Sequence, residues 1–239
     1  ALIAPFFLGH WTPMIGLGLL LGAWVASTAL LNLLSRLREH PAPGLAARLA
    51  AQPGSYYGML LAHFGVSVFI VGVTVVSGFS SESDVRMEPG DVAQVGGYSF
   101  ELKAVNPVTG PNYTALRATV AVSIDGQDLG RLEPERRLYQ VSRMAMTEVA
   151  IDRGLRRDLY VALGEPVGPT AWSVRLHHKP LVNWIWGGCV LMALGGLLAV
   201  MDRRYRARRV AATKPAAARA GEAAAPGELP LLVGRGQVP

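Results

Sequence analysis

The chain has 239 residues, of which 51% are hydrophobic, and a formal charge of +6. Its single cysteine excludes an internal disulfide framework. The apolar residues are gathered in blocks, and three blocks are free of charge and as long as the roughly 20 residues that a bilayer-crossing helix needs. The sequence therefore predicts a multi-pass α-helical membrane protein with three transmembrane helices, rather than a globular protein with buried core helices.

Residues 1–12 are expected to form an outer-side entry segment, in which residues 1–8 are apolar but too short to span a membrane and are interrupted by Pro5 and by the stretch 9–13. The chain begins without Met, and no basic region precedes an apolar core, so the pattern is not that of a signal peptide. We expect the chain to be a piece of a longer protein whose preceding spans lie elsewhere. The first transmembrane helix is predicted at residues 13–34, where Gly18, Gly22 and Ala26 fall four apart and favour close packing in a bundle with helices that lie elsewhere.

The second transmembrane helix is predicted at residues 57–79 and the third at residues 181–201. The segments between and after them differ in charge. Residues 35–56 hold three arginines against one glutamate, and residues 202–239 hold eight basic against three acidic side chains, whereas residues 80–180 hold 12 basic and 13 acidic ones.

Because loops rich in Lys and Arg stay in the cytoplasm, we expect a cytoplasmic loop at residues 35–56 and an extracytoplasmic domain at residues 80–180. The basic Ala/Pro/Gly-rich tail, residues 202–239, is expected to be disordered, cytoplasmic and able to contact membrane lipid. Its place beside a membrane exit accounts for the pI of 9.8 without nucleic acid as a partner.

The segment 80–180 is predicted to be a small all-β sandwich or barrel. Residues 91–95 and 98–105 flank Gly96-Gly97, a two-residue hairpin signal, and further short apolar runs follow at similar spacing. Residues 144–151 fit either a helical turn or a strand. The charge run 133–137 is expected to be a solvated turn, and Met144 and Met146 are expected to pack rather than to bind haem or metal.

Five histidines are candidates for chemistry. His10 and His40 lie at the membrane edges and are expected to be solvated or interfacial. His177 and His178 are neighbours on a predicted strand, so they point to opposite faces and chelate poorly together.

His63 lies seven positions into the second span with no charge beside it. An ionisable residue at such a place is a functional candidate, either as a proton relay or as a haem ligand, and otherwise a structural hydrogen-bonding group. Small residues at Gly58, Ala62 and Gly65 are expected to leave room beside it for a flat macrocycle.

Residues 1–205 resemble the C-terminal part of the CcmF family, the integral-membrane haem lyase component of bacterial cytochrome c maturation. The segments that carry the resemblance are 55–65 (SYYGMLLAHFG), 110–113 (GPNY), 134–139 (PERRLY), 146–148 (MTE), 158–165 (DLYVALGE), 179–186 (KPLVNWIW) and 202–205 (DRRY).

The resemblance implies a role in attaching haem to the Cys-X-X-Cys-His motif of apocytochrome c on the periplasmic side of the inner membrane. It implies as partners the haem chaperone CcmE, a CcmH-type subunit, apocytochrome c and the remaining CcmF transmembrane helices. It also implies a haem b between two transmembrane histidines, with His63 as one axial ligand of the iron.

The family's Trp-rich haem-handling segment has no counterpart in this sequence, so no catalytic residue is assigned here, and whether the chain counts as an enzyme stays open. His177-His178 stands where relatives are expected to have aromatic residues. The alternative is a non-enzymatic, membrane-anchored periplasmic binding or scaffold module of a transporter-type complex, in which His63 is structural.

Overall fold

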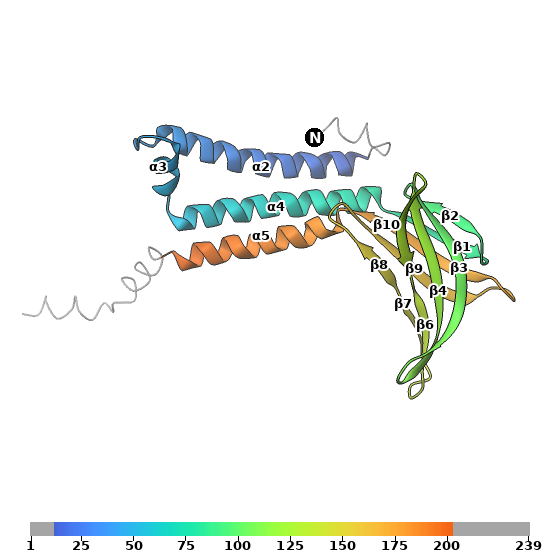
Figure 1. Ribbon diagram of the computed structural model, residues 1–239. Coiled ribbons are helices and arrows are strands. Elements are labelled where there is room, and N and C mark those ends of the chain that lie inside the picture. The colour runs from blue at the N-terminus through green and yellow to red at the C-terminus, as the bar shows by residue number, and fades with distance from the viewer. Residues whose placement is uncertain (1–11, 203–239) are drawn as a thin grey trace, which may run out of the picture.

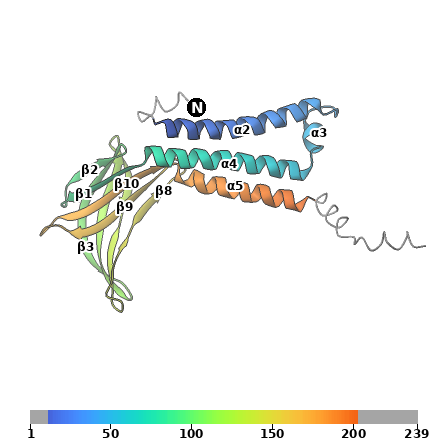
Figure 2. The ribbon, with the colours of Figure 1, turned by 180° about the vertical axis from the view of Figure 1, so that it is seen from behind.

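The structure, a computed structural model, describes residues 12–202, so His10, nearly all of the segment 1–12 and the tail after Asp202 lie outside the described residues. Three helices are long and apolar enough to cross a membrane: α2 (Pro13–Glu39), α4 (Gly54–Phe79) and α5 (Val182–Met201). They lie side by side with α4 in the middle, and all the strands gather beyond one end of them (Figures 1 and 2). The predicted fold class is confirmed: three membrane-spanning helices with a small β-sandwich.

The first helix begins where its sequence requires. Thr12 is extended, and its hydroxyl oxygen accepts a hydrogen bond from Ile15 N at 3.3 Å, while Pro13 occupies the first turn, where its missing N–H costs nothing. The helix ends at Glu39, five residues beyond the predicted span. Backbone hydrogen bonds do not depend on hydrocarbon, so a spanning helix continues into water until another signal ends it.

The expected loop 35–56 is therefore partly helical, since it also contains α3 (Leu45–Ala50) and the first turn of α4. Arg48 in α3 fixes this connection, because its guanidinium donates to Leu37 O at 3.1 Å and to Ala42 O at 2.9 Å. The first bond satisfies a carbonyl in the last turn of α2 that has no helical partner, the second holds the loop after the helix, and together they bring positive charge to the helix end.

Helices α4 and α5 pack backbone against backbone. Gly58, Gly65 and Gly72 recur every seven residues on α4, where Gly58 faces Gly195, Gly65 faces Gly188 and Gly72 faces Ile185 of α5. A β-carbon built on Gly65 would lie 2.7 Å from Met192 N, and one built on Gly188 would lie 2.6 Å from Phe69 N. Only glycine permits this approach, which is the small-residue packing typical of helices in lipid.

Helix α2 packs on the other side of α4. The Ser67 hydroxyl on α4 donates a hydrogen bond to Gly22 O on α2, with 2.8 Å between the two oxygens. The Tyr56 hydroxyl donates to Asn32 Oδ1, also at 2.8 Å. The small residues predicted to pack in the first span, among them Gly18 and Gly22, thus have a partner helix within this chain.

Ten strands form two antiparallel sheets. One sheet runs in the order β1 (Ser81–Met87), β10 (Trp172–Pro180), β9 (Arg157–Pro166), β8 (Ala150–Arg153). The other runs β2 (Val92–Val95), β3 (Tyr98–Thr109), β4 (Tyr113–Ile124), β6 (Glu135–Tyr139), β7 (Ala145–Glu148), with β5 (Gln127–Leu132) also paired to β4. Of the two architectures left open, the structure is a sandwich.

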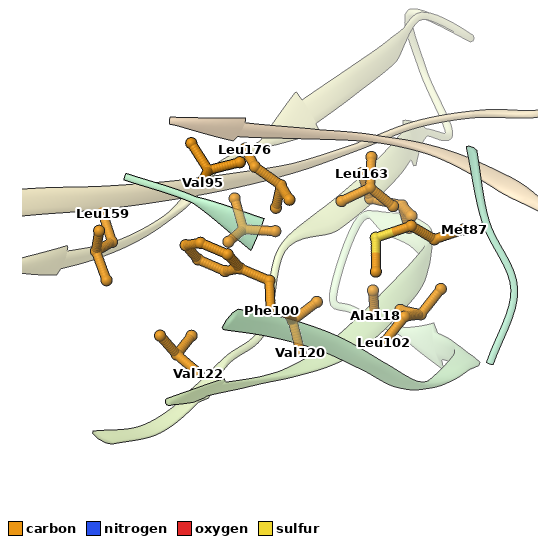
Figure 3. Close-up of a cluster of buried hydrophobic side chains, with 12 residues drawn as sticks. Met87, Val95, Phe100, Leu102, Ala118, Val120, Val122, Leu159, Leu163 and Leu176 are labelled. Carbon is orange, nitrogen blue, oxygen red and sulfur yellow. The ribbon is translucent and has the colours of Figure 1, made fainter. Parts of the chain in front are cut away.

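The core lies between the two sheets. Its side chains point inward from strands of both layers, with Phe100 at the centre between Leu102, Val120, Leu159 and Leu176, all fully buried (Figure 3). These residues alternate along their strands with more exposed ones, as period-two patterning requires.

Two features of the sandwich were not resolved from the sequence. Residues 144–151, which fitted a turn or a strand, form the two strands β7 and β8 on different sheets. β1 was not predicted at all, because its sequence SESDVRM carries apolar side chains only at Val85 and Met87. It pairs with β10 along its whole length, from Ser81 opposite His178 to Met87 opposite Trp172.

The sandwich is fastened to the start of α5 by the turn between β8 and β9. Asn183 Nδ2 donates to Gly154 O at 2.7 Å and to Asp158 Oδ1 at 3.0 Å, and Trp184 Nε1 donates to Leu155 O at 3.0 Å. The backbone N–H of Leu181 donates to Arg156 O, also at 3.0 Å. The helix end and the turn therefore satisfy each other's polar groups.

The glycine contact predicts a sharp contrast between two adjacent positions. We expect Gly188→Leu to force α4 and α5 apart and to destabilise the protein by about 1–3 kcal/mol, the usual cost of overpacking. Gly187→Leu is the matched control, because a β-carbon at Gly187 meets nothing within 4 Å. Thermal unfolding of the two variants in detergent measures the difference, and equal melting temperatures would contradict the proposed packing.

Candidate functional site

The best-defined candidate group in the membrane helices is the imidazole of His63. Its ring is exposed on the surface of α4, and its Nδ1 lies 2.8 Å from Met59 O, one turn earlier on the same helix. A carbonyl oxygen only accepts, so Nδ1 donates in this contact, and Nε2 is left without a hydrogen-bond partner among the described residues. This is the arrangement that metal-bound histidines commonly show, with one ring nitrogen donating to a carbonyl and the other free to ligate.

The space for a macrocycle that was expected beside His63 is not found next to the small residues of α4. Gly58, Ala62 and Gly65 face α5, whose backbone fills the space next to them. At about 100° of rotation per residue, His63 lies roughly 140° around the helix from Gly58. The expectation that these small residues accommodate a macrocycle is therefore wrong. The flank that carries His63 carries Met59 instead, which is partly exposed.

His63 has no partner on a neighbouring helix among the residues that the structure describes. Its one hydrogen bond stays within α4. The next polar side chain along that side of the helix is Ser67, whose single hydroxyl proton is donated to Gly22 O. A structural hydrogen bond between helices, the alternative for an intramembrane histidine, is thus not seen in this part of the chain.

The other described histidines occupy separate places. His40 follows the end of α2, where its Nδ1 accepts a hydrogen bond from Ala42 N at 3.2 Å. His177 faces outward beside Tyr160, with Nδ1 3.3 Å from a Glu82 carboxylate oxygen but without hydrogen-bond geometry. His178 points to the opposite face and stacks on Tyr98, with ring centroids 5.4 Å apart. Within residues 12–202, no three His, Cys, Asp or Glu residues lie together in a way that could hold a metal ion.

The environment of His178 disfavours its charged form. Burial lowers the pKa of its imidazole below the ordinary value, and the positive charge of Arg157 lowers it further. Arg157 also lies over the Tyr98 ring, 5.1 Å from the centroid, and pairs with Asp152. His178 is therefore an uncharged aromatic side chain near the junction of the sandwich and the membrane helices.

The charge run 133–137 is not the solvated turn that the sequence predicted. Glu135 is 5% exposed, and its carboxylate accepts hydrogen bonds from Arg117 Nε at 2.7 Å and from Arg137 Nε at 2.7 Å. Arg137 in turn lies over the Tyr113 ring, 4.5 Å from its centroid. The sequence signal for this network was the alternation within β6, which sends residue 135 to the opposite side from residue 136.

Met144 and Met146 lie at the far end of the sandwich, and their side chains are more than half exposed. Met144 is the last residue of the turn between β6 and β7, and Met146 lies in β7. Of the core or surface packing expected for the two methionines, the structure shows surface positions, and within the described residues neither has a metal-binding group of three or more His, Cys, Asp or Glu beside it.

Comparison with known proteins gives a consistent result. The family profile described as "CcmF C-terminal beta-sandwich" matches residues 78–180. The chain is 44% identical over 205 residues to the cytochrome c-type biogenesis protein CcmF of Pseudomonas aeruginosa, a match that covers 86% of this chain and 31% of the relative. It is 43% identical over 192 residues to CcmF of Escherichia coli, covering 80% of this chain and 28% of that protein.

Among solved structures, the fold resembles a protein titled "Cytochrome c Heme Lyase CcmF", with a TM-score of 0.63 and 20% sequence identity. That match covers 80% of this chain and 31% of the solved one. At this identity the structural likeness supports the fold. The chain spans about 31% of the length of the relative from Pseudomonas aeruginosa that it matches.

The buried carboxylate predicts a pH-dependent stability. Hydrogen bonds from Arg137, and then from Arg117, hold the pKa of Glu135 below its ordinary value. The unfolded chain therefore takes up a proton at higher pH than the native one, so this stabilisation is present above about pH 4.3 and is lost as the pH falls through the native pKa.

We expect Glu135→Gln to weaken the sandwich by about 2 kcal/mol at neutral pH, the scale of hydrogen bonds to charged groups. Glu133→Gln, at an exposed carboxylate 3.5 Å from Arg117, is the matched control and should change stability by less than about 0.5 kcal/mol. Hydrogen exchange of the β4 and β6 amides measures both. Equal protection in the two variants would count against the buried network.

His178 predicts a second pH effect, at higher pH. Because its native pKa is lowered, the unfolded state binds the proton first, and stability falls as the pH drops below the ordinary value of about 6.5. His178→Phe keeps the stacking on Tyr98 and removes the titrating group. Unfolding midpoints measured between about pH 5 and 8 should show a shallower slope for this variant. An unchanged slope would show that His178 does not cause the dependence.

Proposed function

Since this chain belongs to the CcmF family of cytochrome c-type biogenesis proteins, we propose that it works within a cytochrome c haem lyase. In this proposal its helices supply one axial ligand of a transmembrane haem b, and its β-sandwich stands in the periplasm. The observation that carries the proposal is His63: an imidazole in an apolar helix whose Nδ1 is bound to Met59 O and whose Nε2 is left free.

The residues present fit a haem ligand. Neutral imidazole is a standard axial ligand of haem iron, and a donor bond from its other nitrogen fixes the tautomer and raises its basicity. Met59 O provides that bond from within the same helix, so the ring is oriented before any ligand arrives. A bound haem b would supply one-electron redox chemistry inside the membrane.

The second axial ligand is proposed to come from one of the remaining CcmF transmembrane helices. His63 is the one histidine in the three long helices that the structure describes. The matched relatives are about three times as long as the region they share with this chain, which leaves ample sequence for further helices.

The proposed orientation follows from charge. The α2–α4 connection and the segment after α5 carry the excess of Lys and Arg, whereas residues 80–180 carry 12 basic and 13 acidic side chains. By the positive-inside rule the β-sandwich then lies on the periplasmic side of the bacterial inner membrane, with the C-terminus in the cytoplasm.

In this proposal, the reaction that the protein supports is the attachment of haem to the Cys-X-X-Cys-His motif of apocytochrome c. Each reduced cysteine thiol adds across a haem vinyl group: an S–C bond forms, the thiol hydrogen passes to the other vinyl carbon, and nothing is released. No catalytic residue for this step is assigned to the described part of this chain. The proposed partners are CcmE as haem donor, a CcmH-type subunit, and apocytochrome c, any of which can meet the sandwich outside the membrane.

The haem proposal predicts that His63→Gly abolishes the reduced-minus-oxidised haem b spectrum and lowers the yield of mature cytochrome c at least tenfold. The substitution is introduced into the protein at its natural length, and the variant is expressed in cells and purified in detergent. Added imidazole should restore part of the Soret band, since it can bind where the side chain was removed. His40→Gly is the matched control, because His40 lies at the end of α2, and it should leave the spectrum intact.

Two outcomes would count against the proposal. An unchanged spectrum in His63→Gly would show that another residue ligates the iron. A wild-type protein with no Soret band would remove haem b altogether and favour a binding or scaffold module that lacks a cofactor.

A further inference from the structure

The turn that joins β8 to β9 exposes one apolar and two basic side chains. Leu155 at its tip is 81% exposed, and its neighbours Arg153 and Arg156 are exposed as well. Within residues 12–202 neither arginine forms an ion pair, whereas Arg157 at the base of the turn is held by Asp152 and Tyr98. A single exposed leucine is ordinary on a protein surface, and Val141 on the turn between β6 and β7 is even more exposed, so what distinguishes the β8–β9 turn is its position beside α5.

The position of this turn is fixed relative to the membrane helices. The carbonyls of Gly154, Leu155 and Arg156 accept hydrogen bonds from Asn183, Trp184 and Leu181 in the first turn of α5. In Figures 1 and 2 the turn lies against the end of α5 nearest the sheets, whereas the turn between β6 and β7 lies at the opposite end of the sandwich. The tip is thus at the depth where the apolar helix begins.

That depth is the boundary between hydrocarbon and water. Helix α5 carries no charged side chain from Val182 to Met201, so its first turn marks the edge of the apolar layer. Trp184 and Trp186 in this turn are exposed, and Trp is enriched at membrane interfaces. A leucine side chain beside them reaches the acyl boundary, and arginines beside it reach lipid phosphates, as long basic side chains do at interfaces.

We propose that the β8–β9 turn is a membrane-anchoring contact, in which Leu155 inserts into the outer face of the bilayer and Arg153 and Arg156 bind anionic lipid headgroups. The contact continues the apolar surface of the first turns of α5, where Trp184 and Trp186 are exposed. Together with the hydrogen bonds to α5, it holds the sandwich at one tilt over the membrane. This inference does not depend on His63 or on haem.

Fluorescence quenching of labelled protein in nanodiscs tests the insertion. In a Cys189→Ala background, Leu155→Cys is labelled with an environment-sensitive fluorophore. Val141→Cys, at 96% exposure on the turn between β6 and β7, is labelled as the matched control. We expect nitroxide lipids to quench the label at 155 and aqueous iodide to leave it bright, with the reverse at 141. Quenching by iodide at 155 would overturn the proposal, and protection from both quenchers would assign the turn to a protein contact and overturn it too.

Single arginine variants test the lipid preference separately. The label at 155 reports the enrichment of nitroxide-labelled phosphatidylglycerol over phosphatidylcholine around the turn. Arg156→Gln should reduce this enrichment about fivefold, the scale expected for one basic side chain at an anionic surface. Arg143→Gln, at an exposed arginine between β6 and β7, should leave it unchanged. Equal enrichment in the two variants would overturn the headgroup contact.

Discussion

The close approach of α4 and α5 is the constraint on which the rest of the molecule depends. Helix α4 leads directly into β1, and β10 leads directly into α5, so the two helices and two strands form one continuous pair. Neighbouring strands lie about 4.8 Å apart, whereas helices usually pack 8–10 Å apart. Glycines at 58, 65 and 72 bring the helix backbones together and so reduce the mismatch where helices become strands. The β-sandwich is therefore continuous with the α4–α5 pair, and no linker separates it from these two helices.

The same packing decides which side of α4 is available for chemistry. The glycine side is filled by α5, and the side that carries Ser67 is filled by α2. His63 lies on the flank between these contacts, next to Met59. Its direction is thus set by residues that serve helix packing, and a ligand of His63 must approach from outside this three-helix group.

The sequence predicted what depends on composition and local periodicity. Charge-free length located the three spans, and alternation located most strands. Prediction from the sequence failed where contact with another strand, side chain or helix determines the local structure. β1 is polar in sequence and is a strand because β10 lies beside it, and Glu135 is buried because Arg117 and Arg137 come from two strands to meet it. Gly58 and Gly65 indicated free space beside His63 because the sequence does not show that α5 packs against these two glycines.

The energetics of His63 favour completion from outside the described residues. A polar nitrogen left unpaired in hydrocarbon costs about 1–3 kcal/mol, which a ligand or a hydrogen-bond donor recovers. Nδ1 is satisfied by Met59 O, so the cost rests on Nε2. Nε2 needs a donor or a metal, and the hydroxyl proton of nearby Ser67 is already given to Gly22 O. The helix fixes the ring through Nδ1 and leaves Nε2 open to a partner beyond the described residues, either a metal, as we propose, or a hydrogen-bond donor from another helix.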